Sequence, residues 1–327
     1  MTPEPATVLT IRAPEDILAL VPVLLGFEPA ESLVMLTLGC DPPFHARADL
    51  PAASADLPEL VDSLLAPACQ HGVRRVILVA YSERGRPADR ALHAVARALR
   101  RSGVEVLAGL RTDGRRWHPV PKQAGVPAHG VAYDVSGHPF AAQAVYDGRV
   151  VHGSREALAA TLRADPDAVA RVVGELAGLP GRPAPALEEG CWARDLVALH
   201  TRDGTSPSDA DLARLLRGVL DVSVRDAAWS VLRREVAAAH VAFWSDVVRR
   251  TPDPLVPAPA ALLAFAAWQA GHGALAWCAV DRCDEVDPGY SLAGLVARIL
   301  EGAVPPTAWD CTGDWSVGAS MQPPEAG

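Results

Sequence analysis

Four side chains that donate hydrogen bonds or bind anions follow two predicted buried strands. They are Tyr81, Ser82, Arg84 and Arg111. A helical segment separates the two strands, residues 74–80 and 104–111, so a βαβ unit with parallel strands is expected. Open α/β sheets bind ligands at the carboxyl ends of such strands, and arginine pairs with phosphate through two hydrogen bonds. These residues predict a site for a small phosphorylated or nucleotide-like anion, in an enzyme or a sensor.

The region around those strands is rich in arginine. Residues 71–118 contain eleven arginines against four acidic residues, in a chain whose formal net charge is −9. The helical segment 86–102 is predicted to carry a basic patch. Its members are Arg90, Arg97, Arg100 and Arg101. Such a patch attracts nucleic acid or a phosphorylated ligand, but an ordinary solvated helix face has the same composition, and both interpretations stay open.

The motifs of common enzyme classes are missing. The patterns GxSxG and HExxH do not occur, and no GxGxxG follows a strand. The single lysine, Lys122, lies in a Pro-Lys-Gln sequence that is no phosphate-binding loop. We therefore predict no catalytic residue and no cofactor, and we lean against an enzyme.

Histidines gather after the second of these strands without the spacing of a preformed metal site. The residues concerned are His118, His129, His138 and His152, with Asp113, Asp134 and Asp147 nearby. Histidine ligands on one element usually stand one helical turn apart or alternate along a strand, and these do neither. We interpret them as surface or loop-packing residues and predict no metal.

Helices and strands alternate in the first half of the chain. Pro14 followed by two acids is typical of a helix start, and Gly26 of a helix end. Strands are predicted at 7–12, 33–38, 44–50, 74–80, 104–111 and 115–120, and helices at 14–25, 57–69, 86–102, 140–146 and 154–162. The first domain, residues 1–178, is therefore expected to be α/β, with a mixed, largely parallel sheet and flanking helices.

The second half reads as helical. A proline-rich linker is predicted at 179–187, a helical domain at 188–310 and a disordered tail at 311–327. Helices are expected at 189–200, 208–220, 224–250 with a break near Ser230, 258–270, 274–285 and 291–301. Leu263, Gly271, Ala276 and Pro288 are spaced as in a tetratricopeptide-like helical hairpin. The hairpin is either a surface for a protein partner or ordinary helix packing.

Composition bounds the class of protein. Half of the residues are hydrophobic, yet no apolar run is long enough for a membrane span, and the apolar run at 17–25 follows two acids and not the basic start of a signal peptide. The six cysteines are scattered with no CxxC pair, as in proteins of reducing compartments. We expect a cytoplasmic protein with no membrane partner.

Three sequence blocks resemble one family. They are LGFEPAESLV at 25–34, GRVV at 148–151 followed by SREAL at 154–158, and a set that includes AW at 267–268, DPGYSLA at 287–293, PP at 305–306 and Trp309. The chain resembles the bacterial, mainly actinobacterial, family called domain of unknown function 4192. In many members of the family, the β-hairpin that Asp113-Gly114 predicts here is followed by a cysteine-containing loop, whereas residues 118–125 contain no cysteine.

The resemblance implies no activity, cofactor or site residue. We therefore expect a non-catalytic interaction or regulatory protein that acts through its helical domain. The first alternative is an enzyme or sensor for a small anionic ligand at the strand ends. The second is weak nucleic-acid binding through the arginine-rich region 71–118.

Overall fold

The computed structural model describes residues 11–40, 44–146, 150–181 and 184–309. Contacts divide the chain into two compact units. The first, here the α/β unit, comprises residues 1–155 and 301–303, and the second, here the helical unit, comprises the rest. Residues 7–10 of the predicted first strand and the predicted tail at 311–327 lie outside the described residues.

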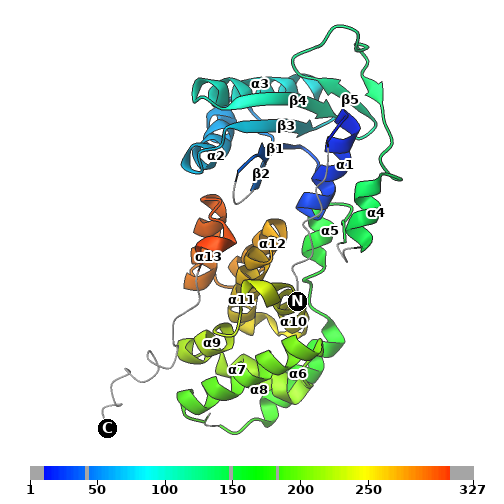
Figure 1. Cartoon of the computed structure of the whole chain (residues 1–327). Coiled ribbons are helices and arrows are strands. Elements are labelled where there is room, and N and C mark those ends of the chain that lie inside the picture. The colour runs from blue at the N-terminus through cyan, green and yellow to red at the C-terminus, as the bar shows by residue number, and fades with distance from the viewer. Residues whose placement is uncertain (1–10, 41–43, 147–149, 182–183, 310–327) are drawn as a thin grey trace, which may run out of the picture. The chain divides into compact units, whose positions relative to one another are not determined.

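The α/β unit is built on one six-stranded sheet (Figure 1). Its elements are α1 (Pro14–Leu25), β1 (Ser32–Leu38), β2 (His45–Asp49), α2 (Leu57–Gln70), β3 (Arg75–Tyr81), α3 (Gly85–Arg101), β4 (Glu105–Thr112), β5 (Arg116–Pro119), β6 (Val131–Ala132) and α4 (Pro139–Tyr146). The strand order is β2-β1-β3-β4-β5-β6. This confirms a mixed α/β fold.

The expectation of a largely parallel sheet is wrong. Only β3 and β4 pair in parallel, across the α3 crossover, and the other pairings among the described strands are antiparallel. The physical reason is that the connection between β1 and β2 is too short for a parallel crossover, so the two strands pair antiparallel. Because β1 also pairs with β3, it lies between β2 and β3 in the sheet. The strands β2, β3 and β4 do run in one direction, but β1 separates the first from the second.

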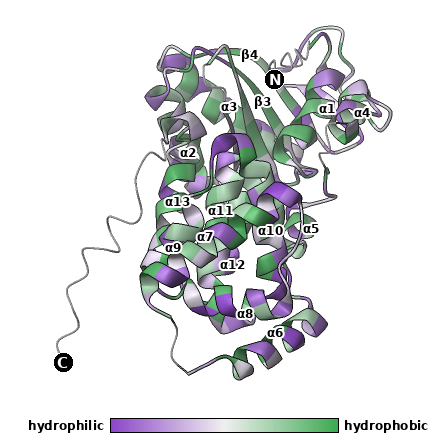
Figure 2. Ribbon diagram, turned by 60° about the horizontal axis from the view of Figure 1, so that its bottom comes forward, coloured by the Kyte–Doolittle hydropathy of each residue, from purple (hydrophilic) through white to green (hydrophobic). Residues whose placement is uncertain are grey.

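Each face of the sheet has its own core. Helices α2 and α3 cover one face, where Leu64, Leu92 and Leu99 pack on Met35 and Leu78. Helix α1 covers the other face with Ile17, Leu18 and Val21. Because both faces are covered, β1 and β3 are almost continuously apolar, as the hydrophobic colouring of β3 shows (Figure 2).

Local chemistry sets the ends of α1. The Asp16 carboxylate accepts hydrogen bonds from the backbone N–H groups of Arg12 and Ala13 at 2.6 and 3.0 Å, and so satisfies donors that the first turn leaves free. Gly26 closes the helix in the left-handed conformation with φ of 79°. The helix continues through Pro22 to Leu25.

The helical unit contains only helices and short turns within its described residues. They are α5 (Arg155–Ala160), α6 (Pro166–Gly178), α7 (Ala186–Asp203), α8 (Asp209–Gly218), α9 (Val222–Trp229), α10 (Ala237–Arg250), α11 (Pro257–Gln269), α12 (Gly273–Asp284) and α13 (Ser291–Glu301). The predicted break near Ser230 separates α9 from α10. Helix α6 is not among the predicted helices.

The helical unit is organised around α11, all of whose residues are buried. Trp229 and Trp268 pack edge-on against Phe265, with ring centroids 4.6 and 5.2 Å away. Trp268, which is buried, and Trp229 thus belong to the aromatic core of this unit. The predicted linker at 179–187 lies inside this unit, because α6 packs on α8 and α10. None of the described helices is long and apolar enough to cross a bilayer.

Candidate functional site

A cavity of about 800 Å³ opens in the α/β unit at the carboxyl ends of β3 and β4. Its wall also contains the loop between α1 and β1 and the segment after β6. The volume lies within the range of small-molecule sites. This is the end of the sheet at which the sequence placed its ligand site.

The strand ends and two turns form the floor of the cavity. The Ser82 backbone N–H donates to the carbonyl of Thr112 at 2.9 Å, which keeps β3 and β4 together to their last residues. Asp113 and Gly114 then turn the chain into β5, with Gly114 at a φ of 87°. The Asp113 carboxylate accepts from the backbone N–H groups of Arg115 and Arg116, which is typical of an aspartate at a tight turn.

Two long-range contacts hold the opposite wall. Trp117 of β5 donates its indole N–H to the Glu15 carboxylate of α1 at 2.8 Å. Gly130 adopts a φ of 78° beside His118, and a Cβ there would lie 2.7 Å from the imidazole ring. Only glycine allows the backbone to pass this close to the His118 ring. The chain then returns to the sheet as β6, which leads to Tyr133.

The cavity wall is acidic. Five carboxylates line it, and they are Glu28, Glu31, Glu83, Asp113 and Asp134. No lysine, arginine or histidine is among the lining residues. Of the five, only Glu31 forms an ion pair among the described residues, so the cavity carries an excess of negative charge.

Glu31 is held in a strained conformation. Its φ of 42° lies in the left-handed region, which costs a non-glycine residue free energy. The carboxylate accepts from the Ser82 hydroxyl at 2.9 Å and from the Arg84 guanidinium at 2.9 and 2.6 Å. Burial alone would raise the pKa of Glu31, but these donors outweigh burial and lower it, so the carboxylate is ionised.

Glu28 lines the cavity together with Tyr81 and Tyr133, and no ion pair with a cation is found for it among the described residues. Although it is exposed to the open cavity, the atoms around it withdraw water and raise the pKa of its carboxyl. Burial raises the pKa of Tyr81, with smaller contributions from Tyr133 and Glu28. Burial also raises the pKa of Tyr133, where the Thr112 hydrogen bond partly opposes it and Glu28 adds to it. The Tyr133 hydroxyl hydrogen-bonds the Thr112 hydroxyl at 2.9 Å. The Tyr81 hydroxyl is buried and has no hydrogen-bond partner among the described residues.

Asp113 and Asp134 are ionised turn residues. For Asp113, burial would raise the pKa, but the N–H groups of Arg115 and Arg116 outweigh it. The backbone N–H of Ser136 lowers the pKa of Asp134, and donates to its Oδ1 at 2.9 Å. Both side chains thus have a local structural role and still face the cavity.

The structure brings two of the four predicted site residues to the cavity. Tyr81 and Ser82 line it, whereas the guanidinium of Arg84 is engaged with Glu31. Arg111 pairs with Asp89 at 2.9 Å, and its side chain packs against Gly85 at the start of α3. The two arginines therefore do not converge on one ligand position.

The sequence interpretation missed Glu28, Glu31, Tyr133 and Asp134. The two glutamates stand in the LGFEPAESLV block. Two acids around Pro29 could have indicated a pair of carboxylates at the turn between α1 and β1. Tyr133 and Asp134 follow a short strand that was predicted as loop, so nothing in the sequence placed them at the sheet.

The predicted basic patch lies on the outer face of α3. Arg90 donates to the Ser54 hydroxyl at 2.6 Å, and Arg90 and Arg97 line a shallow groove with Arg86, Asp89 and His93. Arg100 and Arg101 lie in the last turn of α3. Binding of nucleic acid there stays a prediction.

Three of the four histidines that follow β4 have structural partners. His138 contacts the Asp16 carboxylate at 3.0 Å, and Gly130 packs against the ring of His118. His152 joins the α1–β1 loop through its backbone. Within the described residues no three histidine, cysteine or acidic side chains are grouped to hold a metal ion.

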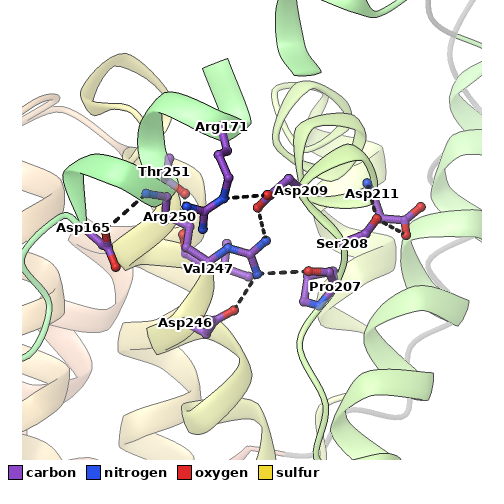
Figure 3. Close-up of polar contacts among 11 residues, drawn as sticks. Asp165, Arg171, Pro207, Ser208, Asp209, Asp211, Asp246, Val247, Arg250 and Thr251 are labelled. Carbon is purple, nitrogen blue, oxygen red and sulfur yellow. Dashed lines mark hydrogen bonds and ion pairs between the residues drawn. The ribbon is translucent and has the colours of Figure 1, made fainter. Parts of the chain in front are cut away.

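The charged groups of the helical unit are arranged differently (Figure 3). Arg250 of α10 donates to Asp209 at 2.7 Å, to Asp246 at 2.9 Å and to the Pro207 carbonyl at 3.0 Å. Arg171 of α6 pairs with the same Asp209 at 2.9 Å. One buried guanidinium thus ties α8 to α10, and Asp209 links both to α6.

The fold and the cavity define a two-unit protein with an acidic ligand-sized cavity in a mixed α/β unit and a second unit of helices. A family model described as a domain of unknown function, DUF4192, matches residues 14–307. The chain belongs to this family. Neither the comparison with curated proteins nor that with solved structures gives a match.

Proposed function

We propose that this protein binds a small, positively charged organic molecule in the cavity of its α/β unit, as a non-catalytic sensor or regulator in the cytoplasm. The observation that carries the proposal is the charge of the wall, where five carboxylates meet no lysine, arginine or histidine. An anion there would be repelled, so the ligand sign differs from the one expected at these strand ends. The free cysteines among the described residues agree with a reducing compartment.

The composition of the wall also fits a small ligand better than a bare ion. Besides the carboxylates it contains apolar residues of α1 and α4, among them Pro22, Val23 and Ala141. Small-molecule sites typically combine an apolar surface with a few polar groups that fix the orientation of the ligand. The wall contains a hydroxyl with a carboxylate beside it, Ser82 with Glu31, but the ion pair with Arg84 makes Glu31 a poor general base, which favours binding over catalysis.

A thermal-shift screen tests the proposal. The cationic probes are primary amines, guanidines and quaternary ammonium compounds. Inorganic phosphate and nucleotides are the anionic probes. We expect one class of cation to raise Tm and the anions to leave it unchanged. Glu83→Gln and Asp134→Asn should weaken the shift.

The matched control is Glu105→Gln. This residue carries the same charge in the same unit, but it begins β4 at the opposite end of the sheet, so the shift should persist. A shift by nucleotides, or no shift by any cation, would overturn the proposal.

A second candidate is a protein partner that docks on the helical unit. Leu220 and Val222, between α8 and α9, are 61 % and 58 % exposed, which is unusual for neighbouring large apolar residues. The test is affinity capture with Leu220→Asp and Val222→Asp. Val145 of α4, which is 75 % exposed, provides the control variant Val145→Asp. A partner that all three variants retain equally would contradict this candidate.

A further inference from the structure

One buried polar group in the cavity wall lacks a partner. Tyr81 is only 7 % exposed, it lines the cavity, and its hydroxyl makes no hydrogen bond within the described part of the chain. Buried hydroxyls are nearly always satisfied by protein, water or ligand. The hydroxyl therefore marks a position where a bound group completes the site.

Glu28 and Tyr133 supply two more oxygens beside that position. Tyr81 is paired in register with Thr112 across β3 and β4, the Thr112 hydroxyl hydrogen-bonds the Tyr133 hydroxyl at 2.9 Å, and Glu28 lines the same cavity. A carboxylate and two phenol oxygens can accept three hydrogen bonds. A primary ammonium offers three N–H donors and no acceptor, so it matches this set, whereas a quaternary ammonium has no N–H to donate.

The remaining carboxylates are spread along the sheet edge. Glu31 precedes β1, Glu83 follows β3, Asp113 follows β4 and Asp134 follows β6. Neighbouring strands lie about 4.8 Å apart, so these charges form a row and not one cluster. A single ammonium at Glu28 would leave most of the row unpaired.

The apolar side of the cavity faces no such charges. Ala19, Pro22 and Val23 of α1 contribute it, together with Ala141. Methylene groups between cationic centres would pack on this surface and lose water there.

We propose that the ligand is a linear polyamine, with one terminal ammonium held by Glu28, Tyr81 and Tyr133 and the further ammonium groups paired with the carboxylates along the strand ends. This inference rests on the proposed function and names its ligand class. A few methylene groups separate the nitrogens of such a chain, which is the order of the spacing between neighbouring strands.

Calorimetric titration of the full chain with butylamine, putrescine and spermidine tests the ligand class. We expect the affinity to rise by about tenfold or more with each added ammonium, and the stoichiometry to stay at one. Raising the salt concentration should weaken spermidine more than butylamine. Spermidine whose terminal nitrogens carry three methyl groups should bind at least about tenfold more weakly, because its ends donate no hydrogen bond.

Variants locate the terminal ammonium. Tyr81→Phe keeps the ring and removes the hydroxyl, and Glu28→Gln removes the charge; each should weaken spermidine by about tenfold. Glu105→Gln, at the far end of the sheet, should not. Circular dichroism and Tm of each variant show that the fold is retained.

The possible outcomes separate the two proposals. Equal affinity for butylamine and spermidine overturns the polyamine but leaves a cation site. Spermidine binding that Glu28→Gln and Glu105→Gln weaken alike indicates association with the acidic surface in general, and overturns the polyamine site. Absence of binding by every amine overturns the polyamine, and the cation site is overturned as well if the guanidines and quaternary ammonium compounds also fail to shift Tm.

Discussion

Glu28 of the α/β unit and Glu189 of the helical unit are both glutamates that are partly withdrawn from water. They differ in whether an arginine pairs with the carboxylate. Glu189 is buried and accepts three hydrogen bonds from the Arg214 guanidinium, the shortest at 2.7 Å. Glu28 shares the cavity wall with two tyrosines, has no ion pair within the described part of the chain, and has a pKa raised by burial. A fold selected only for stability would have neutralised both, since an unpaired desolvated charge is destabilising.

The same contrast holds for the larger sets of charges. In the helical unit, Arg250 and Arg171 neutralise Asp209 and join three helices (Figure 3). Around the cavity, only Glu31 has such a partner within the described residues. Charges that are paired hold the structure together, and charges left unpaired at a concave surface point to a ligand.

The largest expected effect is on the paired charges. Arg250→Ala leaves Asp209 and Asp246 without their main donor and should cost about 2 to 3 kcal/mol of unfolding free energy. Denaturant unfolding measures it. Arg171→Ala is the control, because this side chain is 59 % exposed and should cost less than about 0.5 kcal/mol. Equal losses in the two variants would contradict the central role of Arg250.

The second largest effect is expected on the stability of the helical unit at low pH. His240 is 1 % exposed, and burial lowers its pKa to about 4, with the Val231 backbone partly opposing. Neutral His240 contributes stability above pH 6.5, and this is lost as the pH falls toward 4. At pH 5 the loss is about 2 kcal/mol.

His240→Gln should therefore reduce the loss of stability between pH 7 and pH 5, as followed by thermal unfolding. An unchanged pH dependence would show that protonation of His240 is not its cause.

A smaller effect on the free energy of unfolding is expected from the loss of Arg84, which pairs with the cavity residue Glu31. Arg84→Ala should cost about 0.5 kcal/mol or less, because the Arg84 and Glu31 side chains are 48 % and 45 % exposed. It also frees the Glu31 carboxylate, so the affinity for a cationic probe should rise by about threefold. A fall in affinity, measured by titration, would mean that Arg84 itself contacts the ligand.

The smallest effect on stability is expected at Glu28, and its sign is opposite to that of the other changes. Because its folded-state pKa is raised, the stability that Glu28 contributes is present below its usual pKa and is lost as the pH rises through the folded value. Glu28→Gln should stabilise the free protein at pH 7 by less than about 0.5 kcal/mol.

The comparison at pH 4 is the control for Glu28→Gln, since the protonated wild-type carboxyl and the amide then differ little. Thermal unfolding that shows a loss at pH 7 would contradict the account of Glu28 as an unneutralised charge.

Periodicity and turn residues were enough to predict most of the elements. The apolar stripe of α3 and the apolar runs of β1 and β3 are local properties, and each element forms where it was expected. The sequence did not predict that β1 runs antiparallel to both of its neighbours. A strand has the same composition whether it pairs in parallel or antiparallel, so composition does not reveal its direction.

Side-chain partners were also beyond the sequence. Arg84 and Arg111 stand where a ligand site was expected, but each is engaged by an acid. Glu31, 53 residues earlier in the chain, pairs with Arg84, and Asp89 of α3 pairs with Arg111. Which acid reaches which arginine depends on packing across the sheet. The acids left over, and with them the sign of the ligand, became visible only in three dimensions.

Two backbone hydrogen bonds close a long loop of the α/β unit. The His152 N–H donates to the Gly26 carbonyl at 2.9 Å, and the Glu28 N–H donates to the His152 carbonyl at 2.8 Å. They fasten the end of this unit to the residue that we place at the terminal ammonium. A ligand that orders Glu28 therefore also protects these two amides, and their hydrogen exchange would report occupancy of the cavity without any label on the ligand.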